Sequence, residues 1–185
     1  MIDKELLFDI SKNIGALLGH GDMETLYNEA MLAVPEGGVA IEVGTWKGGS
    51  AVILGNVCKE KGARLICVDA FGGNMFGYAV PQAGLLSQVM FELRGLPVEY
   101  MVGDSGKIVK YLGSDIADLI FIDGDHAYPR VQDDIEGYWY MLKQGGTYLM
   151  HDYTNPCDVK EVAQRLFTLD SIIEMPDSIA KVVKV

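Results

Sequence analysis

The sequence has little positive charge and no long hydrophobic run. Its 15 Lys and Arg residues face 26 Asp and Glu residues, which gives a net charge of -11. This balance excludes nucleic acid and anionic membrane as partners, because both require a basic surface. The longest apolar runs are strand-sized, well short of the ~20 residues that cross a bilayer. The N-terminal MIDKELLFDI carries acids at helical spacing, unlike a signal peptide, so we expect a cytoplasmic protein.

The sequence is also poor in cysteine and lacks internal repeats, low-complexity segments and linkers. Cys58, Cys67 and Cys157 are odd in number and widely spaced, so we expect reduced thiols rather than a disulfide framework or a zinc site. With 185 residues, 49% of them hydrophobic, the chain suits one well-buried domain. We expect a helical segment over 1–35 and a core over 38–185. Glycine, by contrast, is abundant, which indicates many tight turns.

Apolar runs alternate with helical stretches along most of the chain. Strands are predicted at 39–43, 64–68, 98–102, 118–122 and 147–150. Helices are predicted between them, and the last one shows a stripe of Val131, Ile135, Tyr138 and Leu142 that Gly145-Gly146 would end. Because the strands are almost continuously apolar, helices should cover both faces of a parallel sheet. The pattern predicts a doubly wound α/β fold.

The two ends of the chain depart from this alternation. After a helix at 159–167, short strands at 171–175 and 179–185 are separated only by PDS, which predicts an antiparallel hairpin. Together with the five preceding strands, the hairpin makes a mostly parallel seven-stranded sheet. The first 35 residues predict two helices, broken at Gly19-His20-Gly21, that lie outside the core.

Polar residues gather where the predicted strands end. They are 42–50, Asp69, Asp104-Ser105, 123–126 and His151-Asp152. Ligands of open parallel sheets bind outside the carboxyl ends of the strands, so we predict a ligand site at this edge.

The loop after the first strand, EVGTWKGGS, lacks the GxGxxG pattern of dinucleotide-binding proteins, which counts against a nicotinamide-dependent oxidoreductase. Gly44 permits a tight turn, and Gly48-Gly49 let a ligand approach the backbone at a helix N-terminus. Asp69 ends the next strand, where its carboxylate can accept hydrogen bonds from both ribose hydroxyls. The loop and Asp69 together favour a bound adenosine.

The sequence resembles class I S-adenosylmethionine-dependent methyltransferases. It is similar to the small-molecule O-methyltransferase branch, which includes macrocin O-methyltransferase-like, cephalosporin hydroxylase-like and catechol O-methyltransferase-like enzymes. The resemblance rests on AIEVGTWKGGSA, ICVDAFGG, the GDS at 103–105, FIDGDHAY and LKQGGTYLMHDY. It implies a Rossmann-like fold with an antiparallel last strand, and a methyl group transferred to a hydroxyl of a small molecule.

The resemblance also implies which residues bind S-adenosylmethionine. Glu42, Gly44 and Gly48 would surround its methionine part, Asp69 its ribose, and Asp104 and Ser105 its adenine. The rest of the predicted cofactor set is Thr45, Ser50 and Asp123. The cofactor carries a sulfonium and an ammonium group but no phosphate, so an acidic rim suits it.

Asp123 and Asp152 end strands that the resemblance makes neighbours, ~4.8 Å apart. Two carboxylates this close repel each other unless a proton or a cation lies between them, which predicts a divalent ion, Mg²⁺ or Mn²⁺. Related metal-dependent enzymes have acids, or an acid and an amide, where this chain has His151-Asp152. His151 is therefore a candidate third ligand that would also suit Fe²⁺ or Zn²⁺, or it points away from the rim.

His126 is the candidate general base, because an ordinary histidine pKa suits neutral pH. Capping of the turn is an equally open interpretation. Asp125, Asp133 and Asp134 are predicted to serve the turn and the helix start, and Asp134 could also brace the rim.

Three alternatives to metal-assisted O-methyl transfer stay open. The first is the same reaction without metal, the second is a nucleotide-dependent oxidoreductase, and the third is a non-catalytic cofactor-binding protein. We expect a small-molecule substrate, with a pocket shaped by 71–82 and the N-terminal helices. Those apolar helices could also pair copies of the chain in a homo-oligomer.

Overall fold

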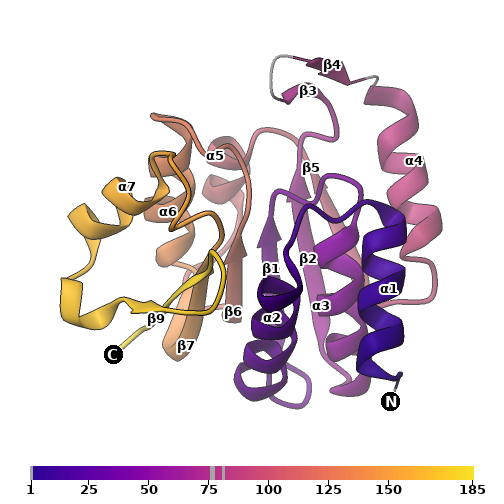
Figure 1. The fold of residues 1–185 in the computed structure, drawn as a ribbon, viewed down its shortest axis with the longest axis horizontal. Helices are drawn as coiled ribbons and strands as arrows, with labels where there is room; N and C mark the ends of the chain where they lie inside the picture. The colour runs from indigo at the N-terminus through magenta and orange to yellow at the C-terminus, as the bar shows by residue number, and fades with distance from the viewer. Residues whose placement is uncertain (1, 76–77, 81) are drawn as a thin grey trace.

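The computed structural model describes residues 2–75, 78–80 and 82–185, and helices flank a central sheet in it (Figure 1). The sheet has seven strands in the order β5-β2-β1-β6-β7-β9-β8. Their bounds are β1 Val39–Val43, β2 Arg64–Asp69, β5 Val98–Val102, β6 Ala117–Ile122, β7 Leu142–Met150, β8 Ile173–Glu174 and β9 Ala180–Val183. A separate antiparallel pair consists of β3 (Gly73–Met75) and β4 (Tyr78–Val80).

The doubly wound fold predicted from the sequence is confirmed. Strands β1, β2, β5, β6 and β7 run parallel, and β9 is antiparallel to both β7 and β8. The strand order reverses between β1 and β6, because the chain builds outward from β1 to β5 and then returns to the other side of β1. This switch point is where such sheets bind ligands.

The helices divide between the two faces of the sheet (Figure 1). One face carries α1 (Lys4–Ile14), α2 (His20–Ala33), α3 (Gly49–Glu60) and α4 (Gln82–Glu92), and the other carries α5 (Ser105–Ile108), α6 (Arg130–Trp139) and α7 (Val159–Leu166). Successive strand residues alternate between the faces. Ala40 joins the core beneath the first group and Ile41 the core beneath the second. Both faces are therefore buried, which explains the continuous apolar runs.

The prediction that the two N-terminal helices lie outside the core is wrong, because both contribute buried side chains to it. Leu7 and Phe8 of α1 and Met23 and Leu26 of α2 are buried in the same core as α3. Gly15 ends α1 in the left-handed conformation, with φ of 110°. The two helices therefore form part of the layer that covers the sheet.

The helix predicted to continue to Gly145-Gly146 is shorter than expected. Helix α6 ends at Trp139, and β7 already begins at Leu142, so the glycine pair lies inside the strand. Gly145 has φ of 79°, and the pairing of β6 with β7 is irregular between Ala117 and Leu119. The glycines therefore form a bulge in the strand rather than a helix end. Leu142 fits the helical stripe only because its buried position coincides with that spacing.

Two further segments differ in extent from the prediction. In the C-terminal hairpin, β8 and β9 are shorter than the predicted strands, and a 3-10 turn over Leu169–Ser171 takes the first residue of the predicted 171–175 strand. The 71–82 segment contains the β3–β4 pair, and its residues 76, 77 and 81 lie outside the described part. Cys58, Cys67 and Cys157 are free thiols, as predicted. Every helix in the described ranges is too short or too polar to cross a membrane.

Candidate functional site

The site lies at the carboxyl ends of β1 and β6, where the backbones of the two strand ends touch. The Asp123 N–H donates to the Val43 carbonyl at 2.8 Å. Gly44 has φ of 92°, and a Cβ built there would lie 2.1 Å from the Asp123 carbonyl oxygen. Only glycine fits this position, since neither the backbone angle nor the space accepts a side chain. Gly44 therefore brings the first loop directly against the predicted metal ligand Asp123.

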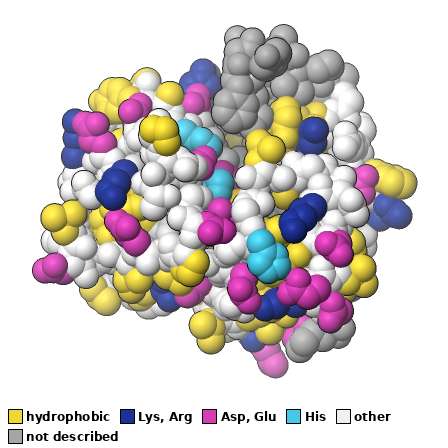
Figure 2. All heavy atoms as spheres, viewed as in Figure 1, with side chains coloured by type: hydrophobic (Ala, Val, Ile, Leu, Met, Phe, Trp, Pro, Cys, Tyr) yellow, Lys and Arg dark blue, Asp and Glu magenta, His cyan; other side chains and the backbone are white. Residues whose placement is uncertain are grey.

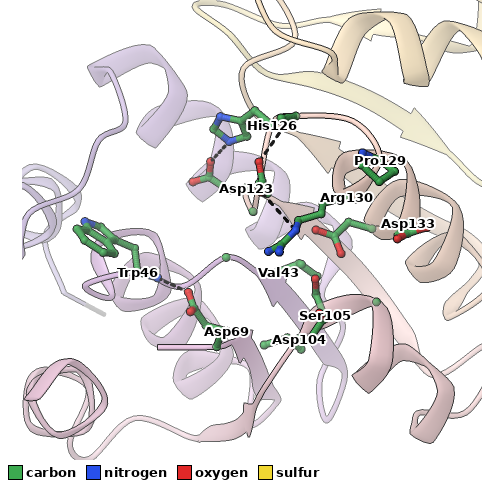
Figure 3. Close-up of a pocket in the computed structure, with 18 of the residues that line it drawn as sticks. Val43, Trp46, Asp69, Asp104, Ser105, Asp123, His126, Pro129, Arg130 and Asp133 are labelled. Carbon is green, nitrogen blue, oxygen red and sulfur yellow. Dashed lines mark hydrogen bonds and ion pairs between the residues drawn. The ribbon is translucent and has the colours of Figure 1, made fainter. Parts of the chain in front are cut away.

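A cleft of about 890 Å³ opens over these strand ends (Figure 3). Among the predicted cofactor residues, those that line it are Gly44, Asp69, Asp104, Ser105 and Asp123. Figure 3 shows Asp69 beside Trp46, and Asp123 beside His126. Other carboxylates on the wall come from Asp125, Asp133, Asp134 and Asp158. The wall is thus acidic, and it suits a ligand with positive charge and no phosphate.

Asp69 is fixed by the backbone of the two loops next to it. Its carboxylate oxygens accept the Trp46 N–H at 2.7 Å and the Phe71 N–H at 2.6 Å. Each carboxylate oxygen keeps a lone pair, so the group can still accept hydrogen bonds from ligand hydroxyls. The predicted role as a ribose acceptor is compatible with this geometry.

Glu42 occupies a different place from its predicted neighbours. Its side chain is fully buried beneath the first loop, close to Ser50, Thr45 and Cys67, and Oε1 has no hydrogen-bond partner. Burial raises the pKa of the Glu42 carboxyl to about 7, although the nearby polar groups of Ser50 and Thr45 act to lower it. Glu42 lines neither this cleft nor the one beside it, and it therefore supports the loop from below.

A second cleft of about 430 Å³ adjoins the first on the side of the N-terminal helices. The loop after α1, residues 15–18, forms one wall, and Thr45 and Ser50 belong to the lining. Gly44, Asp123 and His126 line both clefts, so the two clefts meet there. Like Glu42, the predicted cofactor residue Gly48 lines neither cleft; it precedes α3 as the N-cap, with φ of 91°.

Asp123, His126, His151 and Asp152 form one cluster at this meeting point. A ligand atom from each lies within 4.8 Å of the others. His126 Nδ1 is 2.9 Å from Asp152 Oδ2, and His151 Nδ1 is 2.9 Å from Asp123 Oδ1. The structure thus brings together the predicted metal ligands with the candidate base. His151 points into the cluster rather than away from the rim.

The two carboxylates control the protonation of the two histidines. Burial lowers the pKa of His126, but the neighbouring carboxylates of Asp123 and Asp152 outweigh this effect and raise it to about 9. The same balance raises the pKa of His151 far above its ordinary value and lowers that of Asp152. In the ion-free protein both histidines therefore carry protons at neutral pH. The expectation that His126 has an ordinary pKa does not hold in this environment.

Asp22 also contacts the cluster, although no pattern in the sequence marked it as a site residue. It lies on α2, is 3% exposed, and its Oδ2 is 3.3 Å from His151 Nε2. The pattern HGDMETLYNEA around it gives no sign of a ligand or a turn. Only the packing of α2 beside β7 brings these residues together.

The remaining aspartates of FIDGDHAY and of the following helix have structural positions in the turn, at the start of α6 and behind the cleft wall. Asp125 accepts the Ala127 N–H at 3.1 Å, which is the predicted turn role. Asp133 is exposed in the first turn of α6. Asp134 is 2% exposed and lies beside Ser105, and burial raises its pKa to about 6. Asp134 thus braces the wall of the larger cleft from within.

Figure 2 shows histidine and acidic side chains gathered along the hollow in the middle of one face. With the fold and the geometry of the site described, the chain can be compared with known proteins. The model of a methyltransferase-domain family matches residues 41–153, more than half of the chain.

Solved structures with this fold include several methyltransferases. The O-methyltransferase NovP has 16% identity and a TM-score of 0.75, with 99% of this chain and 100% of that chain covered. The SAH-bound methyltransferase PaMTH1 of Podospora anserina has 12% identity and a TM-score of 0.71, with 100% and 89% covered. TomG from Streptomyces achromogenes, an O-methyltransferase involved in tomaymycin synthesis and solved with SAM, has 15% identity and a TM-score of 0.66, with 100% and 92% covered.

Proposed function

The chain belongs to the methyltransferase-domain family and is an S-adenosylmethionine-dependent methyltransferase, and from that premise we propose that it methylates a hydroxyl of a small molecule with the help of a divalent ion. Asp123, Asp152 and His151 would hold the ion, and His126 would handle the proton of the substrate. One observation carries the proposal: these four side chains converge where the two clefts meet.

The donor set suits a divalent ion. At metal–ligand bonds of ~2.1 Å, neighbouring ligands of an octahedral ion are ~3 Å apart. The 2.9 Å contact of His151 with Asp123 has this spacing. Two carboxylates and one imidazole suit Mn²⁺, Fe²⁺ or Zn²⁺ at least as well as Mg²⁺. A cation would replace the histidine protons that now separate the two acids.

The chain's own residues would place the reactants. Asp69, fixed by the Trp46 and Phe71 N–H groups, would accept the ribose hydroxyls of the cofactor. Gly44 would let the cofactor lie against backbone, and the acidic wall would favour its positive charge. S-adenosylmethionine supplies an activated methyl group that a nucleophile takes by in-line displacement, a reaction that depends mainly on positioning.

Proton removal from the substrate hydroxyl is the second requirement. A divalent ion supplies Lewis acidity, which lowers the pKa of a bound hydroxyl. His126 lines both clefts, and Asp152 would hold its ring through the 2.9 Å contact at Nδ1. Without an ion, His126 is protonated below pH about 9 and cannot accept a proton at neutral pH. This argument favours the metal-assisted reaction over the same reaction without metal.

The test is a calorimetric titration of Mn²⁺ into the purified protein, with and without S-adenosylhomocysteine. We expect Asp123→Ala and Asp152→Ala to weaken Mn²⁺ binding by more than about 100-fold, because loss of a direct ligand should exceed the 10–100-fold effect of an outer partner. The matched control is Asp133→Asn, an exposed acid on the wall of the same cleft, which should leave Mn²⁺ affinity unchanged.

Methyl transfer to a panel of hydroxylated small molecules completes the test. We expect activity that EDTA abolishes and Mn²⁺ or Mg²⁺ restores. Activity that survives EDTA and Asp152→Ala would indicate the metal-independent reaction. Cofactor binding with no transfer to any member of the panel would favour a non-catalytic binding protein.

A further inference from the structure

Asp22 connects the N-terminal helix α2 to the carboxylate–histidine cluster. We propose that Asp22 is a positioning residue that holds the His151 ring with Nδ1 turned toward Asp123 and Asp152. This inference rests on the proposed function, because it assigns to His151 a place among the ion's ligands. If Asp22 has this role, the N-terminal helical segment contributes a residue to the site.

The first argument is that the His151 ring has a carboxylate at each nitrogen. Nδ1 faces Asp123 at 2.9 Å, and Nε2 faces Asp22 at 3.3 Å. The histidine is 6% exposed, so bulk water does not compete for either nitrogen. Once an ion displaces the Nδ1 proton, an Nε2–H that donates to Asp22 leaves the Nδ1 lone pair to point at the rim. A histidine that binds a metal through one nitrogen usually donates its other N–H to such an acceptor.

The second argument is that Asp22 is itself held firmly. The Ser178 N–H donates to Asp22 Oδ1 at 2.9 Å, and the Ser178 hydroxyl contacts both carboxylate oxygens at 3.1 and 3.2 Å. The Ser178 carbonyl in turn accepts the Tyr153 N–H at 2.8 Å. Because Tyr153 directly follows Asp152, this chain of contacts ties α2 to the backbone of the cluster itself.

The third argument is that the turn at 176–178 lies close against the first turn of α2. A Cβ at Gly21 would lie 2.5 Å from the Asp177 carboxylate, and one at Gly19 would lie 2.9 Å from it. The Asp177 side chain is exposed and can move aside, so the glycines ease this approach rather than enforce it. The close packing of the two turns puts the Ser178 N–H within 2.9 Å of Asp22 Oδ1.

Asp22 and Ser178 both lie outside residues 41–153, the part that the methyltransferase family model covers. The two flanking segments meet at His151 from opposite ends of the sequence. A contact that served only to join α2 to the hairpin would be complete with Ser178. The additional contact with His151 Nε2 is not needed to join the two elements, but it is needed to fix the orientation of the His151 ring.

The experiment compares Asp22→Asn with Ser178→Ala. Both variants weaken the link between α2 and the hairpin, but only the first alters the partner of Nε2. We expect Asp22→Asn to weaken Mn²⁺ binding by about 10–100-fold, the effect typical of losing an outer-sphere partner. Ser178→Ala keeps the backbone N–H contact and should leave Mn²⁺ affinity within about threefold, a small change beside that effect. S-adenosylhomocysteine affinity, measured on each variant, verifies that the fold is intact.

Equal Mn²⁺ affinity in Asp22→Asn and Ser178→Ala would overturn the proposal, because Asp22 would then only join two elements. If Asp22→Asn fails to fold, Asp22→Ser takes its place, because its short side chain leaves Nε2 without an acceptor. The same comparison with Ser178→Ala then applies.

A second measurement separates this inference from the proposed function. If the unaltered protein binds no Mn²⁺, the metal-assisted reaction fails, and ring-nitrogen NMR of the ion-free protein judges the role of Asp22. We expect a protected, downfield Nε2–H signal that His151→Gln removes, that Asp22→Asn shifts or removes, and that Ser178→Ala retains. Absence of that signal from the unaltered protein would overturn positioning by Asp22, whatever the variants do.

Discussion

At the scale of single residues, the environment separates carboxylates that look alike in the sequence. Glu42 and Asp69 lie at or near the ends of adjacent strands, and both were predicted to touch the cofactor. Asp69 reaches the cleft and accepts two backbone N–H groups, whereas Glu42 is fully buried with one oxygen unpaired. We therefore expect Asp69 to contribute to cofactor binding and the ionised Glu42 carboxylate to reduce the stability of the fold.

Replacing Glu42 by glutamine should stabilise the protein above neutral pH. The folded-state pKa of about 7 exceeds the ordinary 4.5, so the folded state binds the proton more strongly. Stability should therefore fall as pH rises from about 4.5 to 7, and the loss is complete above 7. We expect Glu42→Gln to raise the free energy of unfolding by about 2–3 kcal/mol at pH 8. Urea denaturation at pH 5 and pH 8 measures this, and equal effects at both pH values would contradict it.

Binding of Mn²⁺ should strengthen as pH rises. Histidine protons must leave before an ion can bind, and the pKa of His126 is raised to about 9. Between pH 6 and 8 the dissociation constant should fall by about tenfold per pH unit for each proton displaced. Calorimetric titrations across this range measure the slope. In His126→Gln the slope should drop by about one proton, and an affinity independent of pH would contradict the protonated cluster.

At the scale of elements, the contact between the ends of β1 and β6 is the feature that creates the site. The β1 loop turns at Gly44, and the backbone of Asp123 occupies the space where a side chain would be. Parallel pairing with matched register brings Val43 beside Ile122, so the residues that follow both strands must meet. The geometry of the site thus depends on two strand ends rather than on one motif.

Gly44→Ala should destabilise the protein by more than about 3 kcal/mol, because the clash is with backbone and no side-chain movement relieves it. S-adenosylhomocysteine binding should be lost with it. The matched control is Gly62→Ala: Gly62 also has positive φ, 57°, but nothing lies within 4 Å of a Cβ there. We expect the control to cost about 1–2 kcal/mol from backbone strain alone. Thermal and urea unfolding measure both variants, and similar costs for the two would rule out the close approach as the cause.

At the scale of the whole molecule, two cores share one sheet. The helices of the N-terminal half cover one face and those of the C-terminal half cover the other (Figure 1). Alternate residues of each strand belong to different cores. If the helices left one face of the sheet, the strands that support the other core would lose their packing as well. We therefore expect the described part of the molecule to unfold as one unit.

The two tryptophans test this expectation, because each reports on one core. Trp46 packs against the core of the N-terminal helices and Trp139 against the other. In Trp46→Phe and Trp139→Phe, the remaining tryptophan should give one urea transition that coincides with the loss of far-UV circular dichroism in the same variant. A fluorescence transition separated from the circular dichroism transition in either variant would show that the two faces unfold independently.

Sequence patterns suffice to predict how strands and helices alternate along the chain, that both faces of the sheet are buried, and on which rim polar residues gather. These features follow from local periodicity and from the rule that parallel strands end at a common edge. The sequence also identified Asp123, His126, His151 and Asp152 as a group. Local spacing misjudged Leu142, because a buried strand residue can fall on a helical stripe by coincidence.

The direction in which His151 faces, the position of Glu42 below the loop and the contact of Asp22 with the cluster depend on how distant segments pack together. His151 and Asp22 are separated by 129 residues, and no local pattern links them. Their contact depends on how α2 packs beside β7 and the C-terminal turn. The pKa values of the cluster depend in turn on that contact and on burial. Periodicity determines what a segment becomes, whereas packing determines which side chains meet.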